Sequence, residues 1–174
     1  MPPDLLDGRP HATAQIRTAG LDPRRLTGPE WTRMTRGVHL PAGLDPADTL
    51  TRIRAAAEVM PAGAALGGWA ALYLQGVDDL DGWRGRPGDD GSRPLPVTIC
   101  LSRPSGRIRK RDEPLFTLDR RTLPESDVVE VDGIRVTSVV RSCSDIACRE
   151  GVEAGMVAAD AAARFGVLRA VDLR

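Results

Sequence analysis

Two Asp-Pro pairs, Asp22-Pro23 and Asp45-Pro46, fix where helices can begin in the first third of the chain. An aspartate at the cap position accepts hydrogen bonds from the free N–H groups of a helix start. Proline suits the first helical position because it lacks an N–H. The first pair therefore predicts a short helix that stops at Gly28-Pro29, and the second predicts a longer helix to about Met60.

The residues around the first pair predict a small winged helix-turn-helix. Residues 11–19 can form a helix that ends at Gly20. After the short second helix, residues 31–34 alternate like a strand, Thr35-Arg36-Gly37 indicates a turn, and residues 38–40 return as a second strand. Helix, turn, short helix and β-hairpin is the order of elements in a small winged helix-turn-helix domain.

Hydrophobic segments separated by turn signals predict a mixed α/β body after the second pair. The strongest signal is Asp132-Gly133, which favours a two-residue hairpin turn, so residues 128–131 and 134–137 should pair as antiparallel strands. Residues 78–94 are rich in Gly, Asp, Arg and Pro and predict an irregular, mobile loop. Further strands are predicted early in 64–76, at 96–101 and at 115–118, and helices over 69–75, 138–149 and 152–165.

Together these predictions give an α+β fold in two parts. An N-terminal winged helix-turn-helix head spans residues 1–44, and a mixed α/β body spans residues 45–174. The body should contain a small, largely antiparallel sheet and C-terminal helices. Within these helices we expect ion pairs between residues four apart, Arg141 with Asp145 and Asp160 with Arg164.

The composition excludes several classes of protein. The formal net charge is 0, from 24 basic and 24 acidic residues, so the whole molecule has no general attraction for nucleic acid. No stretch approaches the roughly 20 apolar residues of a membrane span. The three cysteines, Cys100, Cys143 and Cys148, form no Cys-x-x-Cys pair and predict buried free thiols in a reducing compartment. We expect a cytoplasmic protein with no membrane partner.

The sequence offers no clustered site for catalysis or metal binding. The two histidines, His11 and His39, fall on separate elements, and the aspartates of the 78–94 segment lack the spacing of a calcium loop. Cys143 has no evident base partner, so a core thiol is expected there rather than a nucleophile. We therefore expect no enzymatic activity, no metal and no cofactor.

The candidates for DNA contact lie in the head. Arg24 and Arg25 follow the start of the short second helix, and this end of the recognition helix enters the major groove in helix-turn-helix proteins. Arg33 and Arg36 flank the hairpin tip, where a wing meets the backbone or the minor groove. The alternative is that these are solvated surface charges. The full candidate set is Thr13, Gln15, Arg17, Arg24, Arg25, Thr27, Arg33 and Arg36.

A second basic patch follows the strand predicted at 96–101. It could bind a phosphate backbone or an acidic partner, or it could be a solvated loop between strands. Asp112 and Glu113 follow it directly and weaken its field. The patch consists of Arg103, Arg107, Arg109, Lys110 and Arg111.

Four phrases follow one another along the chain: Arg36–His39, Gly68–Gly76, Gly133–Ser138 followed by Arg141, Asp145 and Ala147, and Asp160–Ala162 before Gly166. In this order they resemble segments of the AbiEi-family antitoxins and related actinobacterial winged-helix proteins. None of the four is a chemical motif, and each is a packing motif. The chain departs from the pattern at His39, where an aromatic residue is usual, and at Cys143, where threonine is commoner.

The resemblance implies a transcriptional autorepressor like the antitoxin of a type IV toxin–antitoxin system. Its head would bind a promoter repeat in double-stranded DNA. Its body would repress, form a homodimer or counter a nucleotidyltransferase-like toxin. Two alternatives stay open. Related proteins often continue into a Vsr or restriction-like nuclease domain, so the chain could be the N-terminal, non-catalytic part of such a protein. It could also be a protein-interaction module that does not bind DNA.

Overall fold

The computed structural model describes residues 7–85, 88–102, 115–169 and 171, which fall into two compact units. The N-terminal unit contains residues 7–60 and Leu115, and the C-terminal unit contains the other described residues from Pro61 onward. The sequence prediction placed the boundary after residue 44, whereas the helix over residues 49–57 groups with the N-terminal unit. No helix among the described residues has the length and apolar character needed to cross a membrane.

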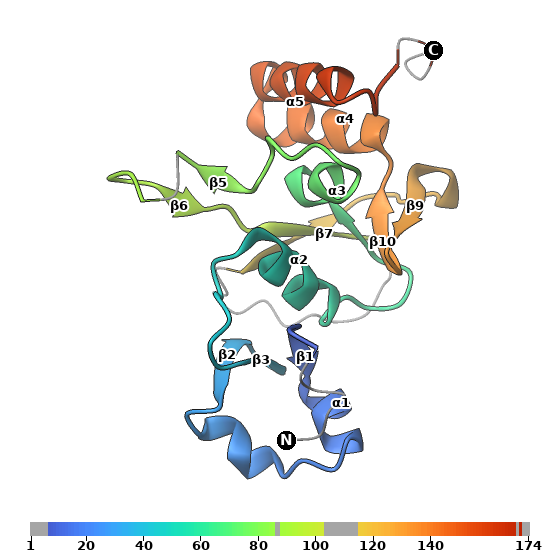
Figure 1. Ribbon diagram of the computed structural model, residues 1–174. Coiled ribbons are helices and arrows are strands. Elements are labelled where there is room, and N and C mark those ends of the chain that lie inside the picture. Colours follow the sequence, from blue (N-terminus) through green and yellow to red (C-terminus); the bar gives the residue numbers. More distant parts are fainter. Residues whose placement is uncertain (1–6, 86–87, 103–114, 170, 172–174) are drawn as a thin grey trace. The chain divides into compact units, whose positions relative to one another are not determined.

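The N-terminal unit combines short helices with an antiparallel sheet in the order β1-β3-β2 (Figure 1). Its small core contains Ile16, Leu21, Leu26 and Trp31, which are all buried. The elements are β1 (His11–Ala12), α1 (Thr13–Thr18), the 3-10 helix η2 (Pro23–Thr27), β2 (Trp31–Thr35), β3 (Val38–Pro41) and α2 (Thr49–Ala57).

Two predictions for this unit need correction. Residues His11 and Ala12 were expected to be helical but form β1, which pairs with β3. The second short helix is present as the 3-10 helix η2, with Asp22 as its cap and Gly28 after its end, as expected. The longer helix begins at Thr49, because the Asp45 carboxylate caps a preceding turn through the Ala47 N–H (2.8 Å). Asp48 is the true cap, and its carboxylate accepts from the N–H of residue 51 (2.8 Å).

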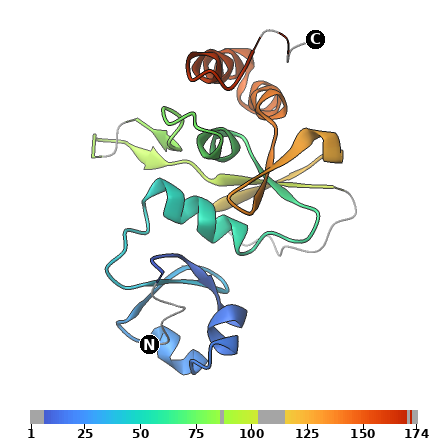
Figure 2. The ribbon, with the colours of Figure 1, turned by 45° about the vertical axis from the view of Figure 1, so that its right-hand side comes forward.

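The C-terminal unit is built on a five-stranded sheet in the order β8-β7-β4-β10-β9 (Figures 1 and 2). The predicted hairpin is confirmed, since Asp132 and Gly133 both have positive φ (50° and 76°) between β9 and β10. The strands are β4 (Ala65–Gly67), β5 (Trp83–Arg84), β6 (Arg93–Pro94), β7 (Val97–Leu101), β8 (Phe116–Arg120), β9 (Val128–Val131) and β10 (Ile134–Thr137).

Three α-helices cover one side of this sheet, with α5 farthest from it (Figures 1 and 2). Leu72, Cys143, Ile146 and Ala162 belong to the core that joins them. At Gly155, α5 lies so close to α4 that a Cβ would collide with Ala147. The helices are α3 (Trp69–Leu74), α4 (Val139–Glu150) and α5 (Val152–Arg164), and the short 3-10 helix η3 (Glu125–Asp127) precedes β9.

The predicted α+β class is confirmed, with C-terminal helices and antiparallel pairing in both small sheets. The five-stranded sheet is mixed, because two of its four pairings, β4–β10 and β7–β8, are parallel. The predicted irregular segment 78–94 contains a two-stranded ribbon, in which Trp83 pairs with Pro94 and Arg84 with Arg93. The sequence did not predict this ribbon, because glycine and proline lie on both sides of it and their abundance indicates an irregular loop.

Candidate nucleic-acid interface

The predicted DNA-contact residues lie on α1, η2 and the β2–β3 hairpin of the N-terminal unit. Ile16 on α1, Leu26 on η2 and Trp31 on β2 pack in one core cluster. This core holds the three elements together and leaves the basic side chains outside. The structure places Thr13, Gln15 and Arg17 on α1, Arg24, Arg25 and Thr27 on η2, Arg33 on β2, and Arg36 in the turn between β2 and β3.

Strand β1 ties the first helix to the hairpin. It runs directly into α1, and it pairs with β3 so that His11 lies opposite His39. The Thr13 N–H, at the start of α1, donates to the carbonyl oxygen of Gly37 in the hairpin turn (2.7 Å). The helix start and the hairpin tip are therefore held together by the backbone.

The 3-10 helix η2 presents Arg24 to solvent. The Asp22 carboxylate accepts from the Arg24 N–H (2.9 Å), and the Thr27 hydroxyl donates to the Arg24 carbonyl oxygen (2.9 Å), which fixes both ends of the turn. The neighbouring Arg25 binds Glu30 across 2.9 Å, and both side chains are 53% exposed. Arg24 makes no ion pair with any described residue and is the available cation of η2.

The hairpin presents Arg36 at its tip. Gly37 supplies the positive φ (85°) that the turn requires, and Arg36 beside it is exposed without an ion pair to a described residue. Arg33 lies opposite His39 and donates from Nε to the Thr35 carbonyl oxygen (3.3 Å). Burial, and then the Arg33 charge, lower the pKa of His39, so this imidazole is neutral at neutral pH. The positive charge of the hairpin therefore comes from arginine.

The three uncharged residues of the predicted contact set have internal hydrogen bonds. The Gln15 side-chain oxygen accepts from the Ala12 N–H (2.9 Å), and the Thr13 hydroxyl lies 3.4 Å from His39 Nδ1. The Thr27 hydroxyl is used within η2. Arg17, Arg24, Arg33 and Arg36 are exposed and have no ion-pair partner among the described residues, and of these Arg33 donates to a backbone carbonyl oxygen. The second predicted patch, Arg103, Arg107, Arg109, Lys110 and Arg111, lies outside the described residues.

A different set of arginines forms an ionic network in the C-terminal unit. Arg141 binds Asp145 through Nε (2.8 Å) and Asp127 through Nη1 (2.8 Å), and its Nη2 donates to the Thr122 carbonyl oxygen (3.0 Å). Arg121 binds the other Asp145 oxygen (3.3 Å). Burial alone would lower the pKa of Arg141, but the hydrogen bonds and the negative charges of Asp145 and Asp127 together outweigh burial and raise it.

The helical part of this network was predicted and the rest was not. The i,i+4 spacing of Arg141 and Asp145 predicted their ion pair, and the pair of Asp160 with Arg164 is also present (3.2 Å). Asp127 lies on η3 and Arg121 follows β8, and no sequence spacing links either of them to α4. Within the described ranges, no group of three or more His, Cys, Asp or Glu side chains is placed to hold a metal ion.

The three cysteines differ in exposure. Cys100 and Cys143 are buried as predicted, whereas Cys148 is exposed on α4. Burial, reinforced by the charges of Asp145 and Asp119, raises the pKa of Cys100 to about 12, so its thiol stays protonated. The prediction of buried thiols is wrong for Cys148, because this residue lies on the exposed face of α4.

Comparison of the chain with profiles of known protein families gives no match, and comparison with curated proteins gives none.

Proposed function

We propose that the chain is a cytoplasmic, non-catalytic regulator that binds double-stranded DNA through its N-terminal unit. One observation carries the proposal: α1, η2 and the hairpin surround one core and present Arg17, Arg24 and Arg36 without ion-pair partners among the described residues. Unpaired guanidinium groups on a helix and a hairpin tip suit phosphate and base-edge contacts. In a chain of zero net charge, affinity for DNA must come from such a local surface.

In this proposal, η2 and the hairpin tip contact different parts of the DNA. Arg24, next to the start of η2, enters the major groove, where a bidentate contact to guanine contributes about 1–3 kcal/mol of discrimination. Arg36, at the hairpin tip, contacts phosphate or a narrow minor groove. The resemblance to AbiEi-family antitoxins extends the proposal to repression of the chain's own promoter, with a nucleotidyltransferase-like toxin as a second partner.

The test is a fluorescence-anisotropy titration of Arg24→Ala and Arg36→Ala in the full chain. Each variant is measured on the DNA upstream of its own gene and on a scrambled duplex, at two salt concentrations. We expect Arg24→Ala to lose affinity mainly for the upstream DNA. We expect Arg36→Ala to lose affinity for both duplexes and to lower the salt slope by about one phosphate contact.

The matched control is Arg120→Ala, which removes an exposed arginine from β8 of the C-terminal unit. Its binding should equal that of the unaltered chain. Equal losses in all three variants would show that DNA contact is not localised to the N-terminal unit. Unchanged binding of Arg24→Ala and Arg36→Ala would contradict the proposal outright.

A further inference from the structure

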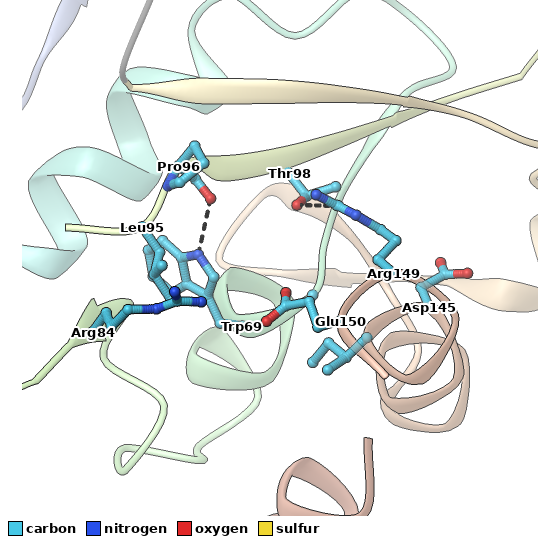
Figure 3. A pocket seen from close by; sticks show the side chains of 10 residues that line it. Trp69, Arg84, Leu95, Pro96, Thr98, Asp145, Arg149 and Glu150 are labelled. Atoms are coloured by element: carbon cyan, nitrogen blue, oxygen red, sulfur yellow. Dashed lines mark hydrogen bonds between the residues drawn. The ribbon is translucent and has the colours of Figure 1, made fainter. Parts of the chain in front are cut away.

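A pocket in the C-terminal unit lies between α3, the β5–β6 ribbon, the start of β7 and the last turns of α4 (Figure 3). Its volume is about 210 Å³. An apolar cavity of about 150 Å³ holds a benzene molecule, so this pocket has room for one ring. It fits an organic molecule of about the size of a single aromatic ring with one substituent.

One wall of the pocket is apolar and rigid. Trp69 is only 7% exposed, and its indole N–H donates to the Pro96 carbonyl oxygen (3.0 Å). A Cβ on Gly82 would lie 2.5 Å from the far edge of the ring, so the indole is tightly enclosed on that side. Leu95 and Ile146 complete the wall. The polar edge of Trp69 is satisfied internally, so the small part of the indole that borders the pocket is apolar.

Two arginines make the rest of the pocket lining positively charged. Arg84 from β5 and Arg149 from α4 enter the pocket from opposite sides in Figure 3. Arg149 Nη1 donates to the Thr98 hydroxyl across 2.6 Å, which holds the guanidinium against β7. Neither arginine forms an ion pair with a described residue. Each therefore keeps donors that can bind an anion.

The acidic lining residues do not cancel this charge. Both carboxylate oxygens of Asp145 are already bound, one by Arg121 (3.3 Å) and the other by Arg141 (2.8 Å). Glu150 is the remaining carboxylate and is exposed. Two guanidinium groups thus face one uncommitted carboxylate, and the pocket has a net positive character.

We propose that this pocket binds a small organic anion that carries a flat apolar group, of the class of aromatic carboxylates and aryl phosphates. The acid group lies between Arg84 and Arg149, and the ring lies against Trp69. A cavity that pairs an apolar wall with a few convergent polar groups is the usual form of a small-molecule site. This inference is independent of DNA binding by the N-terminal unit.

The test uses benzoate, phenyl phosphate and benzylamine as probes of the full chain. The readout is the indole N–H signal of Trp69 in ¹H–¹⁵N spectra, assigned by Trp69→Phe. We expect a saturable shift with at least one of the two anions, with a Kd of about 10 mM or tighter for ligands of this size. Benzylamine has the same ring with a positive charge and should not bind. The anion that binds more tightly identifies the acid group that the site prefers.

Two variants and a control locate the anion contact. Arg84→Gln and Arg149→Gln should each weaken binding by roughly ten- to a hundredfold, as expected for losing a hydrogen bond to a charged group. The control Arg93→Gln changes the exposed arginine paired with Arg84 across the ribbon, outside the pocket, and should bind normally. Arg84→Gln decides the outcome if Arg149→Gln fails to fold. Failure of both anions to shift Trp69, equal binding of benzylamine, or unchanged affinity in Arg84→Gln would overturn the proposal.

Discussion

Arg141 of the C-terminal unit is 16% exposed and binds two carboxylates and a carbonyl oxygen. Arg24 of the N-terminal unit is exposed and makes no ion pair with a described residue. The contacts of Arg141 join α4 to η3 and to the segment after β8, so this arginine stabilises the fold. Arg24 contributes little to the fold and is free to bind something else. In a chain rich in arginine, the partners of each guanidinium separate structural residues from candidate binding residues.

The largest effect that tests this comparison is on stability. Arg141→Ala would leave Asp127 without its arginine and the 9%-exposed Asp145 with Arg121 alone. We expect the free energy of unfolding to fall by about 2–4 kcal/mol, since breaking a largely buried pair leaves a charge poorly compensated. Arg24→Ala should change it by less than about 0.5 kcal/mol. Urea unfolding of both variants checks this, and equal losses would remove the distinction.

A smaller effect, on DNA affinity, is expected at the one arginine of η2 that forms an ion pair, Arg25. Glu30→Gln frees Arg25 from its exposed ion pair (2.9 Å) and removes a negative charge beside η2. If this unit binds DNA, affinity should rise about two- to fivefold at low salt, which is the scale of an exposed ion pair. The gain should shrink as salt screens the charges. Glu153→Gln, at the exposed start of α5, serves as the control in the same titration. Weaker DNA binding by Glu30→Gln would mean that the ion pair positions Arg25 for contact.

The smallest effect is on thermal stability and concerns Glu58, which follows α2. Burial raises the pKa of this carboxyl above its ordinary 4.5, and the His11 charge and hydrogen bonds with Ala12 and Gln15 only partly offset burial. A raised folded-state pKa gives stability that is fully present below the unfolded value and is lost as pH rises through the folded value. Glu58→Gln should therefore have a higher Tm than the unaltered chain at neutral pH. The difference should vanish near pH 4, which calorimetry across this range checks.

Features set by neighbouring residues were predictable from the sequence. The β9–β10 hairpin follows from Asp132-Gly133, because few dipeptides tolerate two consecutive positive φ angles. The ion pair of Arg141 with Asp145 follows from helical spacing. The cap at Asp22 follows from the affinity of a carboxylate for free N–H groups. In each case the deciding interaction lies within a few residues.

Features set by distant residues were not predictable. Strand β1 forms because Val38 and His39 offer backbone partners, while His11 and Ala12 themselves carry no strand pattern. The ion pair between Asp127 and Arg141 depends on where η3 lies beside α4. The pocket around Trp69 draws residues from four separate segments, none of which carries a recognisable motif.

The pairing of β4 with β10 also bears on how the protein is made. Leu66 and Val136, which pair in the middle of the five-stranded sheet, are separated by most of the unit's sequence. On the ribosome, β4 can pair with β7 once residue 101 has left the exit tunnel, but the other edge of β4 has no partner until residue 136 follows. The β1-β3-β2 sheet, by contrast, is complete in sequence by residue 41. Synthesis from the N-terminus therefore lets the first sheet form early, while β4 keeps one edge unpaired until β10 is made much later.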